Sequence, residues 1–246
     1  MLPAYKKENE LWAAVGQRPD WVANALKLGL VIDPTVEQVM RTIDRDIFIL
    51  PFFEQLNTID ETTAREAAMF TVMGLTAPIG IGDALFINST ALPFDATMIT
   101  EGLKTPRRQR VLVIGSGCGY VPAVLSKLGF AEIDGVEIRE DFADMSAQIL
   151  ASNGYPLVTI HHANAAEWIK QQDAPFDLMI SFAAIPSDDE GGKVLQGFLD
   201  HLSPQGLLIT PHGEPDYCPI TVFSKDSGIQ GGYVLIPEAE FTPFVI

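Results

Sequence analysis

The chain has 246 residues and a formal charge of −16 at pH 7, from 16 basic and 32 acidic side chains. This surplus of negative charge argues against non-specific nucleic-acid binding and against attachment to an anionic membrane, because both depend on clustered Lys and Arg. No apolar run approaches the ~20 residues that a membrane-spanning helix needs. Without a secretory signal pattern, and with only two cysteines, the sequence predicts a soluble cytoplasmic protein whose oligomeric state it leaves open.

The first third of the chain is expected to be helical. Hydrophobic periodicity predicts helices over 20–28, 33–50 and 62–73. In the second of these, Pro34 stands near the first turn and Pro51 is expected to end the helix. We therefore expect residues 1–76 to form a helical N-terminal segment packed on a main domain, residues 77–246.

From residue 110 onward, strands alternate with helices. Apolar runs predict strands at 111–114, 133–138, 157–160, 176–181 and 207–210. Strands separated by helices at this spacing predict a doubly wound Rossmann-like α/β fold with a mostly parallel sheet. Residues 217–224 and 232–237 read as strands joined directly, so an antiparallel C-terminal edge is expected. A (β/α)8 barrel would need more strand–helix pairs than the chain contains.

A glycine-rich loop follows the first of these strands. Gly115, Gly117 and Gly119 stand between the strand and a helical pattern, which places bare backbone amides at a helix N-terminus. Glu137 ends the next strand, where an acidic side chain can accept hydrogen bonds from both ribose hydroxyls of a nucleoside. A dinucleotide fingerprint would require glycine where Tyr120 stands, so S-adenosylmethionine fits better than NAD. The alternative is a glycine turn that binds nothing.

Several segments together resemble one family of methyltransferases. They are LGLVIDPTVEQVMRTIDRDIFIL, APIGIGD, VLVIGSGCGY, GVEI, APFDLMISFAAIP, FLDHLSPQGLLITPHG and FTPF. In this order they are similar to the protein-L-isoaspartate O-methyltransferase family of S-adenosylmethionine-dependent enzymes, over about residues 21–246. The glycine loop is common to many methyltransferases, whereas the later runs are more specific to this family.

The resemblance also implies a set of cofactor contacts. The glycine loop would wrap the methionine part of S-adenosylmethionine, Glu137 would bind the ribose, and Ile138 would contact the adenine. Asn164-Ala165 stand where the family usually has Asp-Gly at the adenine edge, and the Asn carbonyl oxygen can still accept a hydrogen bond from an amino group. The implied cofactor contacts are Gly115, Ser116, Gly117, Gly119, Glu137, Ile138, Asn164 and Ala165.

The chain departs from the family pattern at two places. Val113 stands where the family has an acidic residue that helps to hold the cationic amino group of the cofactor, which should weaken binding. Ala91 takes the serine position of the family's T-x-S-x-P segment, which lies over the reaction centre. Ser89 and Thr90 are the nearest hydroxyl-bearing residues and are our candidate catalytic residues, although ordinary turn chemistry also explains them.

The implied reaction is methyl transfer to the carboxylate of an isoaspartyl residue. A carboxylate is already nucleophilic at neutral pH, so alignment and exclusion of water would supply the rate. The acceptor could be a protein, a peptide or a small molecule. Two alternatives stay open: a family member with a changed acceptor, such as a natural product or modified peptide, and a non-catalytic binding module that keeps the fold.

Other chemistry-bearing residues are interpreted as structural. His161-His162 have no Cys or carboxylate at ligand spacing, so no metal site is predicted. His212, at a strand end, either lines the acceptor site or is a hydrogen-bonded structural histidine. Cys118 is expected to pack within the glycine loop, and the acidic turn 187–192 is expected to be a solvated loop.

Overall fold

The structure is a computed structural model that describes residues 21–54, 78–79, 87–88, 92–214, 217–237, 239 and 241–245. The chain forms two compact units, residues 1–97 and 98–246, and each is described by itself. The expected domain boundary between residues 76 and 77 falls within the undescribed segment before β1, and it stays a prediction.

The first unit contains short helices, as its sequence predicts: α2 (Trp21–Lys27), α3 (Pro34–Thr42) and α4 (Asp46–Glu54). Asp33 caps α3 by accepting a hydrogen bond from the backbone N of Thr35 at 2.7 Å. The expectation of one helix ended by Pro51 is wrong. The chain turns to an extended conformation at Ile43, and Pro51 lies inside α4. Helix α4 starts anew at residue 46, and Pro51, the sixth of its nine residues, lacks the N–H that would donate to the carbonyl oxygen of residue 47.

The remaining described parts of this unit include the start of a further helix. Strand β1 (Pro78–Ile79) pairs antiparallel with β2 (Ile87–Asn88). Helix α6 (Leu92–Gly102) runs past the boundary between the units. Pro93 is accommodated in its first turn, where backbone N–H groups have no intrahelical acceptor. The helix expected at 62–73 lies outside the described residues.

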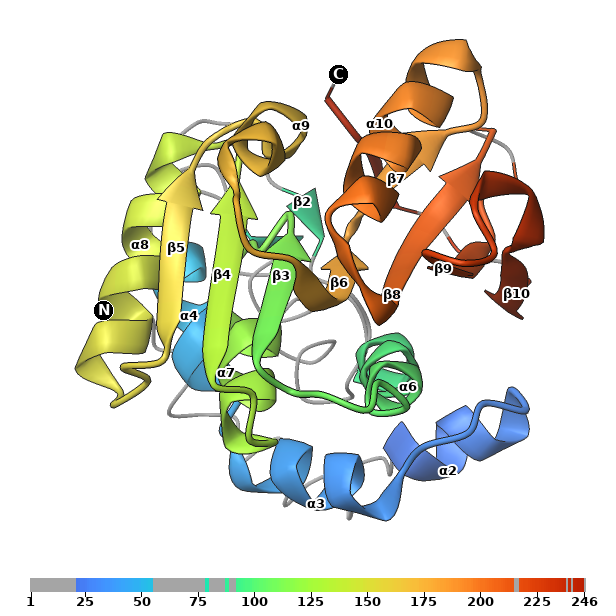
Figure 1. Cartoon of the computed structure of the whole chain (residues 1–246). Coiled ribbons are helices and arrows are strands. Elements are labelled where there is room, and N and C mark those ends of the chain that lie inside the picture. Colours follow the sequence, from blue (N-terminus) through green and yellow to red (C-terminus); the bar gives the residue numbers. More distant parts are fainter. Residues whose placement is uncertain are drawn as a thin grey trace. The chain divides into compact units, whose positions relative to one another are not determined.

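The second unit is built on a large twisted sheet (Figure 1). Its strands are β3 (Arg110–Ile114), β4 (Glu132–Glu137), β5 (Val158–His162), β6 (Phe176–Ser181), β7 (Ala183–Pro186), β8 (Leu202–Gly213), β9 (Ile220–Ser224), β10 (Tyr233–Ile236) and β11 (Thr242–Pro243). Its helices are α7 (Tyr120–Lys127), α8 (Glu140–Ser152), α9 (Ala165–Trp168), η1 (Ile169–Gln171), α10 (Asp189–Asp200) and η2 (Ile229–Gly231).

The strand order is β10-β9-β8-β6-β3-β4-β5. Strands β3, β4, β5, β6 and β8 run parallel to one another, whereas β9 is antiparallel to β8 and β10 is antiparallel to β9. The predicted doubly wound sheet with an antiparallel C-terminal edge is therefore confirmed. From β3 the chain first adds β4 and β5 on one side of β3, and then adds β6 and β8 on the opposite side. The topological switch point, where the strand order reverses, therefore lies between β3 and β6.

Two pieces of strand were not foreseen. The sequence gives β7 only the short run AAIP, and β11 only two residues near the C-terminus. Both lie off the main path of the sheet: β11 pairs with β7, and β7 pairs with the end of β8, in each case parallel. Neither segment is long enough to show the alternation of apolar and polar residues that predicts a strand. Both strands are therefore recognised only from their pairing in the folded structure.

Helices cover both faces of the sheet. Figure 1 shows α9 and α10 on one side, with α7 and α8 on the other. On the α10 side, the strand register aligns Leu112, Met179 and Leu208, all fully buried, across β3, β6 and β8. This row is the centre of a core that also contains Phe198 of α10 and Phe244 of the C-terminal segment. Among the described residues, no helix is long and apolar enough to cross a membrane.

Candidate active site

The glycine loop lies at the carboxyl end of β3, beside the switch point. Gly115, Gly117 and Gly119 have φ angles of 68°, 51° and 86°, a left-handed conformation that glycine adopts without steric cost. Gly119 also serves as the N-cap of α7. A Cβ on Gly119 would lie 3.0 Å from the side chain of Leu150. The loop therefore needs glycine both for its turns and for its close packing on α8.

Glu137 binds the loop from the end of β4. Its Oε2 accepts a hydrogen bond from the backbone N of Gly117 at 3.0 Å, and its Oε1 accepts one from Arg139 N at 3.1 Å. The residue is only 4% exposed, and this burial raises the pKa of its carboxyl, although the backbone N–H donors oppose the shift. Each carboxylate oxygen keeps a lone pair for a further donor, such as a ribose hydroxyl.

Ser116 supplies an unsatisfied group at the same place. Its hydroxyl oxygen is buried and has no hydrogen-bond partner. A Cβ on Gly135 of β4 would lie 3.0 Å from the Cβ of Ser116, so the loop rests directly on a glycine in the neighbouring strand. A buried hydroxyl without a partner is costly unless something else bonds to it. The loop therefore fits a small polar ligand that completes this hydrogen bond.

The residues expected at the adenine end also lie at carboxyl ends of strands. Ile138 follows Glu137 and is 42% exposed, so its side chain offers an apolar surface for a planar base. Asn164 caps α9, its Oδ1 accepting from Ala166 N at 2.9 Å and from Glu167 N at 3.3 Å. Ala165 is buried in the first turn of α9. The structure thus brings the predicted residues of β3, β4 and β5 to one edge of the sheet.

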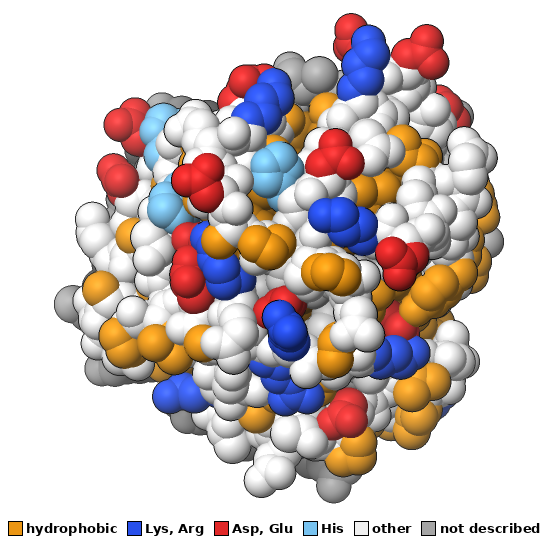
Figure 2. Space-filling model, viewed as in Figure 1, with side chains coloured by type: hydrophobic (Ala, Val, Ile, Leu, Met, Phe, Trp, Pro, Cys, Tyr) orange, Lys and Arg blue, Asp and Glu red, His pale blue; other side chains and the backbone are white. Residues whose placement is uncertain are grey.

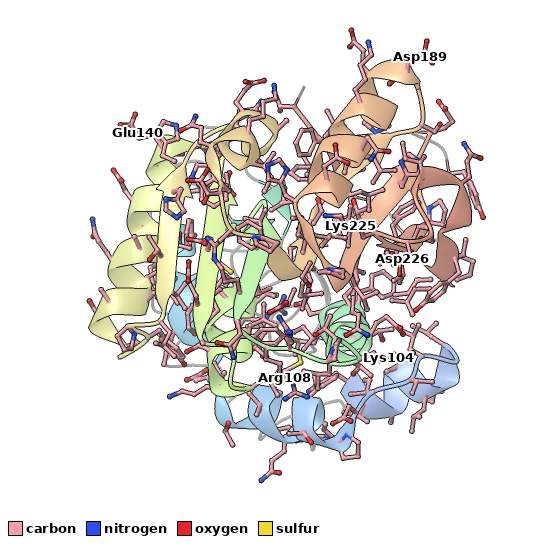
Figure 3. The ribbon with its side chains drawn as sticks, in the orientation of Figure 1. Lys104, Arg108, Glu140, Asp189, Lys225 and Asp226 are labelled. Carbon is pink, nitrogen blue, oxygen red and sulfur yellow. The ribbon has the colours of Figure 1, made fainter. Side chains whose placement is uncertain are left out.

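Charged side chains of both signs stand at this edge, Arg139 among them, paired with Asp141. Glu140 and Asp189 stand where α8 and α10 begin, and both lie at the upper end of the ribbon in Figure 3. Lys104 and Arg108 lie toward its lower end (Figure 3). Figure 2 shows basic and acidic side chains interspersed over this face, its upper edge included, without a broad patch of one sign. A preference for a cationic ligand would therefore come from the net charge of −16 and not from a local acidic patch.

Of the two departures from the family pattern, only Val113 lies among the described residues. Val113 is fully buried in β3, where it pairs in register with Gly135 and Ile180. It packs as a core residue and offers no polar atom to a ligand. Ser89, Thr90 and Ala91 lie outside the described residues, so the candidate catalytic loop stays a prediction.

His161 and His212 have structural partners. His161 Nε2 lies 2.8 Å from Asp134 Oδ1, and Arg110 Nη2 contacts the other oxygen of Asp134 at 3.1 Å. Both histidines lie within β5 itself, and the described residues contain no cluster of side chains suited to a metal ion. His212 Nδ1 lies 3.0 Å from the carbonyl oxygen of Ile185, which joins β8 to β7. This contact supports its interpretation as a hydrogen-bonded structural histidine.

The expected solvated acidic loop at 187–192 is partly wrong. Asp188 accepts a hydrogen bond from Gly191 N at 2.8 Å and caps α10, which begins at Asp189. Gly191 packs tightly, because a Cβ there would lie 2.0 Å from the carbonyl oxygen of Pro186. Asp and Glu in a first helical turn are favoured by the helix dipole, a signal that could have found this start. Cys118 is buried, as expected.

Comparison with known proteins places these features in a family. Residues 17–245 match the family model "Protein-L-isoaspartate(D-aspartate) O-methyltransferase (PCMT)". A protein-L-isoaspartate O-methyltransferase of Roseiflexus castenholzii is 32% identical over 55% of this chain and 56% of its own length. One from Myxococcus xanthus is 31% identical over 69% of this chain and 73% of its own length. The chain thus matches only a little over half the length of the first of these relatives.

A solved structure shares the fold over almost the whole chain. It is a protein of Plasmodium falciparum, assigned to the protein-L-isoaspartate O-methyltransferases and determined in complex with S-adenosyl-L-homocysteine. It has a TM-score of 0.65 and 19% identity, and the match covers 91% of this chain and 95% of that one. At this level of identity the likeness establishes the fold.

Proposed function

Because the chain belongs to the protein-L-isoaspartate(D-aspartate) O-methyltransferase family, we propose that it transfers a methyl group from S-adenosylmethionine to the carboxylate of an isoaspartyl residue in a protein or peptide. The observation that carries this proposal is the hydrogen bond from Gly117 N to Glu137 Oε2, which joins the glycine loop to an acid at the end of the next strand. A soluble cytoplasmic setting is proposed with it, in keeping with the two scattered cysteines.

The chain's own residues fit the cofactor. The hydroxyl of Ser116 and the backbone around Gly117 would hold the methionine part, and the open lone pairs of Glu137 would accept from the ribose hydroxyls. Ile138 would lie against the base. Since Glu137 is already held by two backbone donors, no reorganisation is needed to present its carboxylate.

The cofactor supplies a methyl carbon made electrophilic by the adjacent sulfonium. The acceptor carboxylate is deprotonated at neutral pH, so the chain has no proton to remove before the new O–C bond forms and the C–S bond breaks. What the chain contributes is the alignment of the two reactants and the exclusion of water. We propose that the segment carrying Ser89 and Thr90 performs this positioning, with either hydroxyl donating to the acceptor carboxylate.

The net charge of −16 affects the two reactants in opposite ways. It attracts the sulfonium and amino charges of S-adenosylmethionine, and so offsets in part the missing acid at Val113. It repels a free anionic acceptor. An isoaspartyl residue within a peptide is favoured over a free dicarboxylate, since neighbouring amides and basic side chains of a peptide can lower the repulsion.

Two measurements test the proposal. Calorimetry with S-adenosylhomocysteine should show binding at micromolar to millimolar ligand, and a synthetic isoaspartyl peptide should then accept labelled methyl groups. Its aspartyl counterpart should accept none. Binding without transfer to the isoaspartyl peptide would instead support a family member with another acceptor. No heat at millimolar ligand would contradict the enzyme and leave a binding module that keeps the fold.

A further inference from the structure

The last described residues of the chain are held in place at the carboxyl edge of the sheet. We call residues 241–245 the C-terminal clasp. Its strand β11 pairs parallel with β7, and Phe244 N donates to the carbonyl oxygen of Ala184 at 2.9 Å. The ring of Phe244 is 9% exposed and meets Phe198 of α10 edge to face, with ring centroids 6.0 Å apart. This end of the clasp is therefore anchored to β7 and α10.

The other end is held by Asn164. Its Nδ2 donates to the carbonyl oxygen of Val245 at 3.0 Å, while its Oδ1 accepts from two backbone amides of α9. Both ends of the side-chain amide are thus in use. An aspartate could not serve both roles here, because a carboxylate caps the helix equally well but has no hydrogen to donate to Val245.

The two anchors stand on opposite sides of the switch point. Asn164 follows β5, which belongs to the half of the sheet that runs from β3 through β4. Ala184 belongs to β7, which follows β6 in the other half. In Figure 1 the chain's C-terminal end lies between α9 and α10. The clasp therefore links the two halves at the edge where a nucleoside binds in folds of this type.

From this geometry we propose that Asn164 is a positioning residue: by holding Val245 it closes the C-terminal clasp across the switch point, and the closed clasp strengthens cofactor binding. The proposal rests on the proposed function, since it names the regulation of that same site. A contact that already holds the two halves of the sheet as they stand when cofactor is bound reduces the conformational entropy that the protein loses on binding. By linkage, bound cofactor must in turn stabilise the closed clasp.

The test uses the full-length protein and variants that separate the two hydrogen-bonding roles of Asn164. Asn164→Ser keeps an N-cap acceptor for α9, but its single oxygen replaces only Oδ1 and leaves no group at the place from which Nδ2 donates to Val245. Phe244→Ala releases the opposite anchor without touching residue 164. Gln196→Ser is the matched control, because it replaces another side-chain amide, on α10, that bonds only to Asp200 among the contacts described. Ile138→Ala removes apolar surface at the base and leaves the clasp intact.

Hydrogen exchange at the amide of Phe244 reports clasp opening, and calorimetry reports affinity for S-adenosylhomocysteine. In Asn164→Ser and Phe244→Ala we expect faster exchange and an affinity lower by about three- to ten-fold, as befits one or two lost interactions. The KM for S-adenosylmethionine should rise equally in both variants, and kcat at saturating cofactor should be unchanged in Phe244→Ala, which alters no implied cofactor contact. Gln196→Ser should match the wild type, and Ile138→Ala should lose affinity without faster exchange.

Saturating S-adenosylhomocysteine should slow exchange at Phe244 in the wild type and much less in Asn164→Ser. Unchanged exchange in Asn164→Ser, or faster exchange with unaltered affinity, would overturn the proposal. These readouts are independent of methyl transfer. If the protein binds the ligand but does not methylate isoaspartyl peptides, the proposed function is contradicted. The exchange and affinity measurements would still show whether clasp closure is coupled to ligand binding.

Discussion

Glu137 and Gly117 are 20 residues apart in sequence, and the carboxylate of one accepts a hydrogen bond of 3.0 Å from the backbone N of the other. The loop after β3 and the acid after β4 thus form one preorganised unit at the carboxyl edge. Because the carboxylate is buried, its ionised form depends on these backbone donors, and any change to either residue should disturb both.

Glu137→Gln is therefore expected to weaken binding of S-adenosylhomocysteine by about 10- to 100-fold, the effect of losing a hydrogen bond to a charged group. The amide nitrogen of Gln would also face a backbone N–H donor. Calorimetry measures the change. Glu132→Gln, at the exposed start of the same strand, serves as the control and should bind normally. Equal affinity in both variants would contradict the assigned role.

Cofactor affinity should fall on the acid side of neutrality. Burial raises the pKa of Glu137, so the carboxylate is protonated at a higher pH than an ordinary glutamate. A protonated carboxyl loses acceptor capacity for the ribose hydroxyls, so affinity should decrease as pH is lowered through the raised pKa. Calorimetry between pH 5 and 8 would show this slope. In Glu137→Gln the slope should be absent, and a persisting slope would assign it to another group.

A buried carboxyl in the first unit should make stability depend on pH. Burial raises the pKa of Asp95 from 3.8 to about 7, although the positive charge of Arg45 opposes the shift. Between these values the folded chain holds a proton that the unfolded chain has lost, so this group's contribution decreases as pH rises from about 4 to 7. The full effect is on the order of 4 kcal/mol at most.

Asp95→Asn should remove this dependence. We expect the variant to resemble the wild type near pH 4 and to be increasingly more stable than it towards pH 8, with urea unfolding as the measurement. Asp144→Asn, an exposed carboxylate of α8, should parallel the wild type at both pH values. A wild-type curve that differs from Asp95→Asn by a constant amount would show that folding does not raise the pKa of Asp95.

Two glycine substitutions should have opposite effects. Gly119→Ala places a side chain at φ 86° and 3.0 Å from Leu150, and should destabilise the fold by about 1–3 kcal/mol and abolish cofactor binding. Gly192→Ala lies within α10 with nothing inside 4 Å of its Cβ, and should stabilise by about 0.5–1 kcal/mol. Thermal unfolding and calorimetry distinguish them, and destabilisation by both would contradict this account.

Local sequence determined much of this protein. Apolar runs of strand length predicted β3, β4 and β6, and the glycine loop followed by a helical pattern predicted α7. Glycine positions and strand ends also placed Glu137 beside the loop, because parallel strands carry their carboxyl ends to one edge. These predictions depend on short-range patterns, which a single sequence displays directly.

Long-range contacts decided the rest. Whether Asn164 would face a base or hold Val245 depends on a hydrogen bond between residues 81 positions apart. The pairing of β11 with β7 and the burial of Asp95 likewise arise only when distant segments meet. Such contacts leave no periodic trace in the sequence, because their energy comes from partners that the chain brings together only on folding.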